Sequence, residues 1–568
     1  MKKYLFSAMA VVILAMALCV STFAADVTVS TADELVAIMN DIDSWRNNIT
    51  LTADIDLSGK EQRPIGTYDI PFTGTFDGAG FTIKGLDIAT AATVHEGEGT
   101  VATTDDITAG LFGVVEGATI KNLTVEGKVT NNFVPANAET KIDGNHSATA
   151  GIVAVALMGT NLENLTNKAE VAGPCHVGGV AGILRNFDID DENGTVVAVN
   201  CVNYGTLSPT LGNSGGVFGR LYVKSTVDGV AATIENCANY ADVTSASIDR
   251  NRLAGIVGYI RSESGIIVIT GCRNEGAITG LGGLNGEAEG SNRPYVGGMV
   301  GRIELTAATS ALQLTNCVNT GAISSTYIGG GVAGLLTRGA AAIENPTVVE
   351  NCLNTAVVDG DSYAAGIVGC SDCGAPEVAE GVDATPLLPK IVNNLNTGKV
   401  ELGACSGGVI SQAKNVYVAN CVTLENNVCK VAATSVGTPV VENNYFLKGN
   451  LLDLNPIGTN TEMEFEKITD ATVYTTLDFE NVWAMGEVCP VLKNLASETV
   501  TVSAPFDVNS VINNVVKDVV EATETVSEVV TTNAPATEGG SPVGIIIAVI
   551  AVVVVVAAVV IVIVKKKK

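Results

Sequence analysis

The sequence is poor in basic residues, in aromatic residues and above all in histidine. Its 568 residues include 32 Lys and Arg against 60 Asp and Glu, and 5% are aromatic. Nucleic acid and anionic lipid are poor partners for so acidic a chain, because both carry negative charge. The three histidines, His95, His146 and His176, stand far apart, and Gly99 occupies the place of the second histidine in a zinc-protease motif. A metallopeptidase is therefore not expected.

Helical periodicity is missing from most of the chain, and a short glycine motif recurs instead. The motif reads Gly/Ala-Gly-aliphatic-X-Gly, and two of its copies lack the last glycine. Its nine copies begin at Ala109, Ala150, Gly178, Gly215, Ala254, Gly297, Gly330, Ala365 and Gly407. A recurrence every 28–43 residues or so is typical of a stacked repeat protein.

A second motif, Asn-Cys-X-Asn, keeps step with the glycine motif. Its copies, some with a substituted position, begin at Asn164, Asn200, Asn236, Gly271, Asn316, Asn351 and Asn393. The intervening segments are rich in Val, Ile and Thr and are bounded by Gly or Asn, which favours short strands and turns. We therefore expect three short strands per coil, wound into a parallel β-helix. This all-β fold would place asparagines in amide ladders.

The cysteines of the second motif form one column, consisting of Cys201, Cys237, Cys272, Cys317 and Cys352. Metal ligands or disulfides are the functional interpretation, and a stack of small buried hydrophobic residues is the structural one. In-register neighbours lie about 4.8 Å apart, whereas a disulfide needs Cβ atoms nearer 3.8 Å. The stack is favoured, with thiols that stay reduced.

Together the two motifs resemble those of the GLUG-motif surface proteins. The opening segment strengthens the resemblance through Leu51-Thr-Ala-Asp-Ile-Asp-Leu57 and Phe72-Thr-Gly-Thr-Phe-Asp-Gly78, as does Phe479-Glu-Asn-Val-Trp483 near the end. The resemblance covers roughly residues 26–497 and implies a right-handed parallel β-helix on a bacterial surface, with an adhesion-type role.

The two ends of the chain carry targeting signals. Residues 1–24 resemble a secretory signal peptide, with Lys2 and Lys3 before an apolar run and a cleavage site after Ala24. Residues 543–564 carry no charge and are long enough for a transmembrane helix, and the lysines of 565–568 should stay in the cytoplasm. We expect a single-pass membrane protein of a Gram-positive-type cell with its N-terminal domain outside.

The β-helix is expected over residues 25–497, and a linker follows over residues 498–542. Thr31-Ala-Asp-Glu34 is a capping box that predicts a helix to about Asn40, within an N-terminal cap at 26–60. Residues 450–497, with Trp483 and Pro490, are expected to close the other end. The linker has apolar residues at coiled-coil spacing from Val508 to Val529, so a self-associating helical stalk and a flexible spacer both remain open.

Candidate metal ligands are few. Asp188, Asp190, Asp191 and Glu192 form an oxygen-rich segment, which is either a solvated loop or a calcium site. The segment lacks the glycine and the closing glutamate of an EF-hand. Cys370-Ser-Asp-Cys373 is compatible with a local disulfide or half of a metal site, but no second Cys-X-X-Cys pair accompanies it. No catalytic or cofactor-binding residue is assigned.

Five insertions interrupt the repeat, and repeat proteins often bind ligands through such loops. They are Thr90–Ile107, Thr130–Thr149, Arg185–Asn193, Leu281–Arg293 and Cys370–Pro389. The expected function is binding of an extracellular glycan or matrix protein at a cell surface, without catalysis. A polysaccharide-degrading enzyme on the same scaffold and a purely structural spacer are the alternatives. Carboxylates facing one another across adjacent coils, with an arginine nearby, would favour the enzyme.

Overall fold

The computed structural model describes residues 24–90, 94–95, 108–135, 147–174, 176–188, 192–224, 229–246, 251–282, 293–339, 344–401, 403–424, 431–448 and 457–502. The predicted signal peptide up to residue 23, the stalk beyond residue 502, the membrane segment 543–564 and the lysine tail lie outside these ranges. Within the ranges, none of the helices has the length and hydrophobicity needed to cross a bilayer. The chain divides into two compact units, Met1–Val243 and Thr244–Lys568, which are described in turn.

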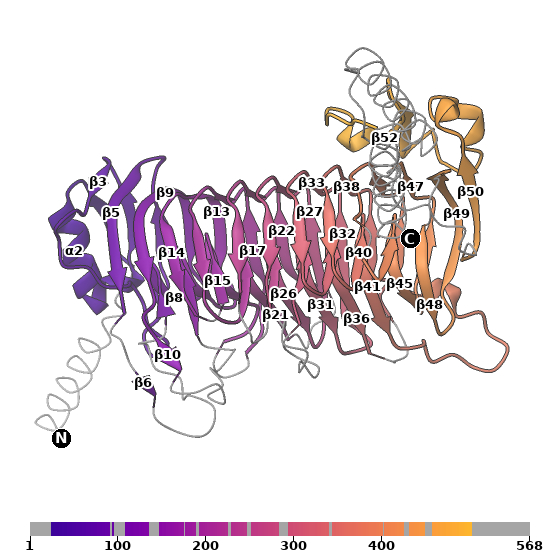
Figure 1. Cartoon of the computed structure of the whole chain (residues 1–568). Helices are drawn as coiled ribbons and strands as arrows, with labels where there is room; N and C mark the ends of the chain where they lie inside the picture. Colours follow the sequence, from indigo (N-terminus) through magenta and orange to yellow (C-terminus); the bar gives the residue numbers. More distant parts are fainter. Residues whose placement is uncertain are drawn as a thin grey trace, which may run out of the picture. The chain divides into compact units, whose positions relative to one another are not determined.

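Unit 1 consists of parallel strands stacked in three sheets (Figure 1). The broad sheet contains β1 (Asp26–Val29), β2 (Asn48–Leu51), β3 (Ile55–Asp56), β4 (Thr75–Asp77), β5 (Thr82–Ala89), β9 (Thr119–Thr130), β13 (Asn161–Asn167), β14 (Glu170–Gly173), β17 (Val196–Val199), β18 (Val202–Asn203), β19 (Leu207–Pro209), β22 (Val230–Glu235) and β23 (Ala238–Asn239). The pre-motif sheet, whose strands lead into the glycine motif, contains β7 (Thr108–Ala109), β11 (Ala148–Ala150), β15 (His176–Gly178) and β20 (Asn213–Gly215). The post-motif sheet contains β8 (Phe112–Val115), β12 (Val153–Ala156), β16 (Ala181–Arg185) and β21 (Phe218–Val223). A separate parallel pair joins β6 (Val94–His95) to β10 (Val134–Pro135).

Unit 2 repeats the arrangement, and β24 (Val243–Ser245) crosses the boundary between the units. Its broad sheet contains β27 (Ile266–Thr270), β28 (Arg273–Asn274), β29 (Ile278–Gly280), β32 (Ala311–Thr315), β33 (Val318–Asn319), β34 (Ile323–Ser325), β37 (Val348–Glu350), β38 (Leu353–Asn354), β39 (Val358–Gly360), β42 (Lys390–Val392), β43 (Leu395–Asn396), β46 (Tyr417–Ala419), β47 (Val422–Thr423), β49 (Val440–Leu447) and β50 (Thr459–Met463). The pre-motif sheet contains β25 (Arg252–Ala254), β30 (Tyr295–Gly297), β35 (Ile328–Gly330), β40 (Tyr363–Ala365) and β44 (Cys405–Gly407). The post-motif sheet contains β26 (Val257–Ser262), β31 (Val300–Leu305), β36 (Ala333–Arg338), β41 (Val368–Cys373), β45 (Ile410–Lys414) and β48 (Ala432–Val436).

Both units are therefore parallel β-helices, as the repeat predicted. The expected number of strands per coil was wrong, because one coil runs through the five strands from β15 to β19. The broad side of the coil is broken where Asn200, with a φ of 54°, separates β17 from β18. A left-handed residue interrupts the extended backbone. At Asn200 it divides this side of the coil into short strands, whereas β13 continues through Asn164, whose φ is 53°.

The first asparagine of each Asn-Cys-X-Asn copy occupies this left-handed position. Its φ is 53° at Asn164, 56° at Asn316 and 55° at Asn351. Gly271 replaces the asparagine in one copy, and its φ is 65°. Asparagine and glycine are the residues that adopt this conformation most readily, which explains why glycine is the one replacement at the first position of the motif.

The second asparagine of each copy is buried and forms the predicted amide ladder. In unit 1, Asn167 Nδ2 donates to Asn203 Oδ1 at 2.8 Å, and Asn203 donates to Asn239 at 3.0 Å. In unit 2 the ladder consists of the bonds Asn274 to Asn319, Asn319 to Asn354 and Asn354 to Asn396, each of 2.8 Å. Buried amides need such partners, so the ladder also fixes the register of the coils.

The glycine motif and the asparagine ladder are spatially complementary. A Cβ added at Gly255 would lie 2.2 Å from Asn274 Oδ1, and one at Gly331 would lie 2.5 Å from Asn354 Cγ. Neither glycine has a positive φ, so the reason for glycine here is close approach rather than backbone conformation. The two motifs recur together because each carboxamide occupies the space that a side chain would fill.

The cysteine column is buried, as predicted for a stack of small hydrophobic residues. Cys317 Sγ lies 3.2 Å from the Thr315 carbonyl and Cys352 Sγ lies 3.3 Å from that of Glu350. Burial raises the pKa of Cys317 well above its ordinary value and that of Cys421 to about 12, so these thiols resist ionisation. Cys370 and Cys373 are also buried free thiols. Three residues apart on β41, they point to opposite faces, which excludes a local disulfide in this conformation.

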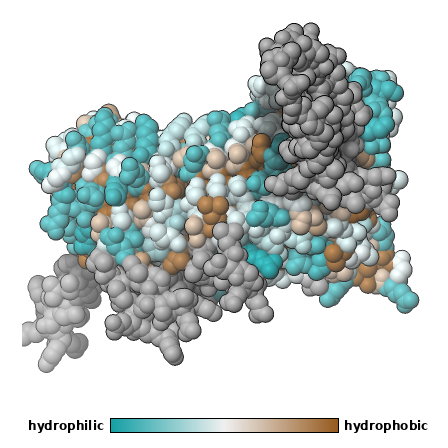
Figure 2. All heavy atoms as spheres, in the orientation of Figure 1, coloured by the Kyte–Doolittle hydropathy of each residue, from teal (hydrophilic) through white to brown (hydrophobic). Residues whose placement is uncertain are grey.

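The N-terminal capping helix is confirmed. Helix α2 (Ala32–Asn40) starts at the capping box, in which Thr31 Oγ1 accepts from the Glu34 N–H and Glu34 Oε2 accepts from the Thr31 N–H. It buries Leu35, Ile38 and Met39, and the 3-10 helix η1 (Ile42–Arg46) that follows buries Trp45. On the face drawn in Figure 2 this end of unit 1 is mostly hydrophilic.

The C-terminal segment, residues 457–502, extends the β-helix by one strand and then folds back along its flank. β50 pairs with β49, after which come η4 (Phe465–Lys467), η5 (Ala471–Val473), the antiparallel pair β51 (Trp483–Met485) and β52 (Pro490–Leu492), and η6 (Lys493–Leu495). Trp483 and Leu492 share a hydrophobic cluster with Val318, Leu353 and Leu395, which follow the column of motif cysteines. The segment thus covers outward-facing side chains of several coils, and the remaining 3-10 helix η3 (Thr385–Leu387) lies in the last insertion.

Candidate functional site

The side chains that flank the glycine motif face each other at a corner of the coil. The motif places a pre-motif residue and a post-motif residue seven positions apart, as in Tyr295 and Arg302. Arg302 Cζ lies 5.6 Å from the centre of the Tyr295 ring. One coil earlier the same two positions hold Arg252 and Tyr259, and Arg252 Cζ lies 4.3 Å from that ring. Strand pairing stacks these positions, with Arg252 beside Tyr295 and Tyr259 beside Arg302.

Together with their neighbours, these residues form a connected set in unit 2 that we call the corner cluster. Its members are Arg252, Tyr259, Arg261, Arg293, Tyr295, Arg302, Glu304, Tyr327 and Tyr363. Three tyrosines continue it along the stack, because the ring centres of Tyr295 and Tyr327 lie 5.9 Å apart and those of Tyr327 and Tyr363 lie 5.7 Å apart, both edge to face. The Arg293 guanidinium lies 4.5 Å from the centre of the Tyr327 ring.

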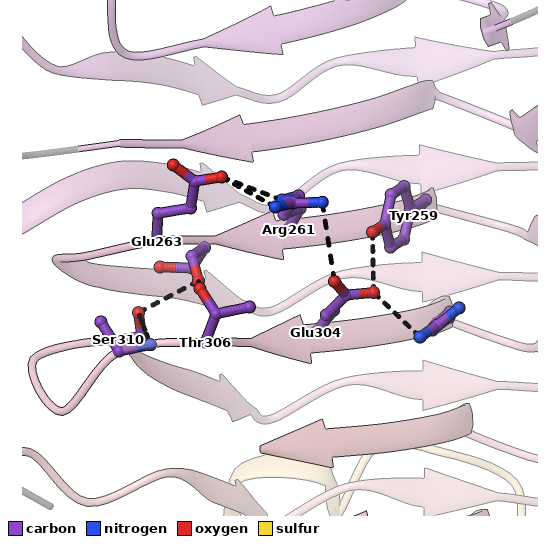
Figure 3. A network of polar contacts seen from close by, with 9 residues as sticks. Tyr259, Arg261, Glu263, Glu304, Thr306 and Ser310 are labelled. Atoms are coloured by element: carbon purple, nitrogen blue, oxygen red, sulfur yellow. Dashed lines mark hydrogen bonds and ion pairs between the residues drawn. The ribbon is translucent and has the colours of Figure 1, made fainter. Parts of the chain in front are cut away.

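Glu304 is the polar centre of the cluster. Its carboxylate accepts a hydrogen bond from Tyr259 Oη at 2.9 Å and ion pairs from Arg302 at 2.9 Å and Arg261 at 3.7 Å. Arg261 also pairs with Glu263 at 2.9 Å. Figure 3 shows Arg261 between the two glutamates, with Tyr259 beside Arg261 on the same strand and both directed at Glu304. Tyrosine hydroxyl and guanidinium groups thus already hold one carboxylate at this corner.

Two tyrosines of the cluster, Tyr295 and Tyr363, are held in the neutral form by burial. Burial raises the pKa of Tyr295 and of Tyr363 above the ordinary phenol value. Tyr259 and Tyr295 are buried, whereas Tyr327 and Tyr363 are partly exposed and Arg293 is exposed. Arg261, Arg302 and Glu304 are also partly exposed, but they pair with one another, so the accessible part of the cluster combines two aromatic rings, the Arg293 guanidinium and this ion-paired group.

Unit 1 carries a second group of arginines on aromatic rings. Arg185 Cζ lies 4.3 Å from the centre of the Phe187 ring, Arg220 Cζ lies 4.6 Å from that of Tyr222, and the two rings are in edge-to-face contact. Each unit thus has arginine on aromatic rings beside its glycine motifs. In unit 2 the sequence signal is a pair seven positions apart around the motif, as in Arg252 and Tyr259, whereas in unit 1 it is an arginine two positions before an aromatic residue just after the motif.

The calcium candidates are brought together only in part. Asp188 Oδ1 accepts from the Glu192 N–H at 2.8 Å, and the Asp188 carbonyl accepts from Arg185 at 2.7 Å. Backbone and guanidinium donors thus already bond the carboxylate and the carbonyl of Asp188. Asp190 and Asp191 lie outside the described residues. In the part of the chain that is described, no three His, Cys, Asp or Glu side chains are placed to hold a metal ion.

The first, second and fourth insertions lie mostly outside the described residues, but their attachment points are clear, and the fifth is described throughout. The first, second and fourth all connect the broad sheet to the pre-motif sheet, between β5 and β7, β9 and β11, and β29 and β30. Pairing of β6 with β10 places the first two side by side. Their contribution to ligand binding stays a prediction.

Comparisons with known proteins leave the family open. No family model matches the chain, and no curated protein matches it. One solved structure, described as a putative immunoglobulin A1 protease from Bacteroides ovatus, aligns at 15% identity over 82% of this chain and 92% of its own. The TM-score is 0.25, so this similarity supports no conclusion about fold or activity.

Proposed function

We propose that the chain is a membrane-anchored cell-surface binding protein of the GLUG-motif type, without catalysis. In this proposal, residues 1–24 direct secretion, 543–564 anchor the chain in the membrane of a Gram-positive-type cell, and the right-handed β-helix presents a ligand-binding surface outside. The observation that carries the binding role is the corner cluster. The scaffold itself does not require it, because the register positions of Arg252 and Tyr259 hold Ile328 and Leu335 in a later coil.

The chemistry of the cluster favours a glycan as the ligand. Tyrosine and arginine dominate binding hot spots, since they combine a large apolar surface with directional hydrogen bonds. An aromatic ring packs against the apolar face of a sugar, and the guanidinium and hydroxyl groups can bond its substituents. The insertions on the neighbouring edge would extend the contact.

Binding is tested with the full-length protein in detergent micelles, on arrays of glycans and matrix proteins with and without calcium. We expect retention of a glycan, no turnover of it, and loss of retention in Tyr259→Phe, because the buried Tyr259 hydroxyl holds Glu304 in place among the arginines of the cluster. The matched control is Tyr417→Phe, because Tyr417 Oη donates to Glu442 at 3.0 Å in the same way outside the cluster. Loss of binding in both variants, or in neither, would remove the corner cluster from the proposal.

A second candidate function is cleavage of a polysaccharide. One observation favours it: Glu263 and Glu304 come from adjacent coils and share Arg261. Glycosidases work with two carboxyl groups on either side of the scissile bond. Reproducible turnover that is abolished in Glu304→Gln and kept in Glu442→Gln would establish the enzyme and overturn the binding-only proposal.

A further inference from the structure

The corner cluster concentrates positive charge on a very acidic protein. The whole chain has a net charge of −28. The cluster has four arginines and one glutamate, Glu304. A second carboxylate, that of Glu263, pairs with Arg261 of the cluster. Because salt screens charges beyond about 8 Å, a ligand at the corner experiences these arginines more than the distant acidic residues. The cluster is thus suited to an anion of low charge, while a polyanion such as nucleic acid would be repelled by the rest of the surface.

Arg293 is the arginine that is placed to meet such an anion. Its side chain is exposed and stacks on Tyr327, and in the described ranges no carboxylate pairs with it. Stacking on a ring holds a guanidinium while leaving its N–H groups directed outward. Those N–H groups match a carboxylate in bidentate geometry.

The neighbouring rings determine what should carry the carboxylate. Tyr327 and Tyr363 are partly exposed and adjacent, so a ligand ring can rest against aromatic surface beside the guanidinium. Glu304 shows that the cluster already satisfies a carboxylate with a tyrosine hydroxyl and two guanidiniums. A sugar ring with an apolar face and a carboxylate at its edge fits both features.

Given the proposed function, on which this rests, we infer that the corner cluster binds a carboxylated pyranose, either a uronate or a sialate. Arg293 pairs with the carboxylate, and Tyr327 and Tyr363 contact the ring. A neutral sugar would lack the ion pair, which makes the charge of the ligand the main determinant of selectivity.

The test compares charged and uncharged partners of equal shape, using the full-length protein in detergent micelles. Polygalacturonate is compared with its methyl ester, and a sialyllactose conjugate with a lactose conjugate, so the two sources of carboxylate are distinguished. We expect at least one charged probe to bind about tenfold or more tightly than its neutral partner, which corresponds to about 1.4 kcal/mol. The preference should decline as salt is raised.

Arg293→Gln should abolish the preference, so that the charged probe and its neutral partner bind with equal affinity. The matched control is Arg63→Gln, because Arg63 stacks on Trp45 at 5.6 Å in unit 1 and should have no effect. Equal affinity for charged and neutral probes, or a preference that survives in Arg293→Gln, would overturn the inference while leaving the proposed binding function intact. Failure to bind any glycan on the arrays would instead overturn the proposed function.

Discussion

Replacing Asn354 by alanine should be among the most destabilising single changes in unit 2. The side chain is fully buried and takes part in four hydrogen bonds. Nδ2 donates to Asn396 Oδ1 at 2.8 Å and to the Ala356 carbonyl at 3.0 Å, while Oδ1 accepts from Asn319 at 2.8 Å and from the Ala356 N–H at 3.4 Å. At about 1 kcal/mol for each bond, Asn354→Ala should cost about 4 kcal/mol of local stability.

The loss should be local, because coils of a solenoid interact mainly with their nearest neighbours. Amide hydrogen exchange is therefore the appropriate assay, and it should show about a thousandfold faster exchange in β33, β38 and β43. Strands far along the stack should exchange at their original rates. Asn351→Gly is the control from the same coil, since glycine adopts the left-handed conformation of Asn351 without strain.

The control should change exchange by tenfold at most. If Asn354→Ala accelerates exchange no more than Asn351→Gly does, the buried amide ladder contributes no more to local stability than an amide that is bonded to water. An effect spread evenly over the whole of unit 2 would instead refute the local character of the loss, because the coils would then unfold as one block.

Three further predictions concern other parts of the chain. Gly255→Ala should destabilise unit 2 by about 2 kcal/mol through overpacking, because the three atoms nearest the added Cβ all belong to Asn274. A second change, Asn274→Gly, should recover part of this loss in chemical denaturation. Strict additivity of the two changes in unfolding free energy would contradict the clash. Hydrogen bonds from the Ser30 backbone and from the Ser30 and Thr31 hydroxyls lower the pKa of Glu34. Ionised Glu34 therefore stabilises α2 above the ordinary carboxyl pKa, and this stabilisation is lost as pH falls through the lower pKa of the folded state. Trp45 fluorescence should follow the loss, and Glu34→Gln should flatten the dependence of fluorescence on pH. Among the described cysteines, the partly exposed Cys405 should react first with iodoacetamide in native protein, and Cys421, with its pKa raised to about 12, should react only after unfolding; mass spectrometry that finds early labelling of Cys421 would refute its burial.

The scaffold was largely predictable because it repeats. The glycine and asparagine motifs predicted a parallel β-helix with buried amide ladders, and Thr31 and Glu34 predicted the capping helix. The number of strands per coil was not predictable, because the left-handed turn at the first asparagine depends on tertiary packing and breaks one side of the coil. The return of the C-terminal segment along the flank was also missed, since its apolar residues show which groups are buried but not what buries them.

The candidate site was missed for a different reason. Motifs draw attention to residues that repeat, whereas Arg252, Tyr259 and Tyr295 stand at positions that change from coil to coil. Their relation appears only when the corner brings positions seven apart into contact and strand pairing adds the next coil. The acidic cluster that includes Asp188 and Glu192 is easier to notice in sequence, although in the structure the Asp188 carboxylate accepts a hydrogen bond from the Glu192 N–H.

The folded-back C-terminal segment has a mechanical consequence. Arg273 pairs with Glu498 and Asn494 donates to Asn316, so the described chain ends on the flank of unit 2 beside its early coils. A force applied at residue 502 would therefore pull sideways on the apolar contacts of Trp483 and Leu492 before it reached the ladders between strands. The C-terminal segment would therefore detach before the stacked coils were sheared, and its detachment would limit the force that reaches them.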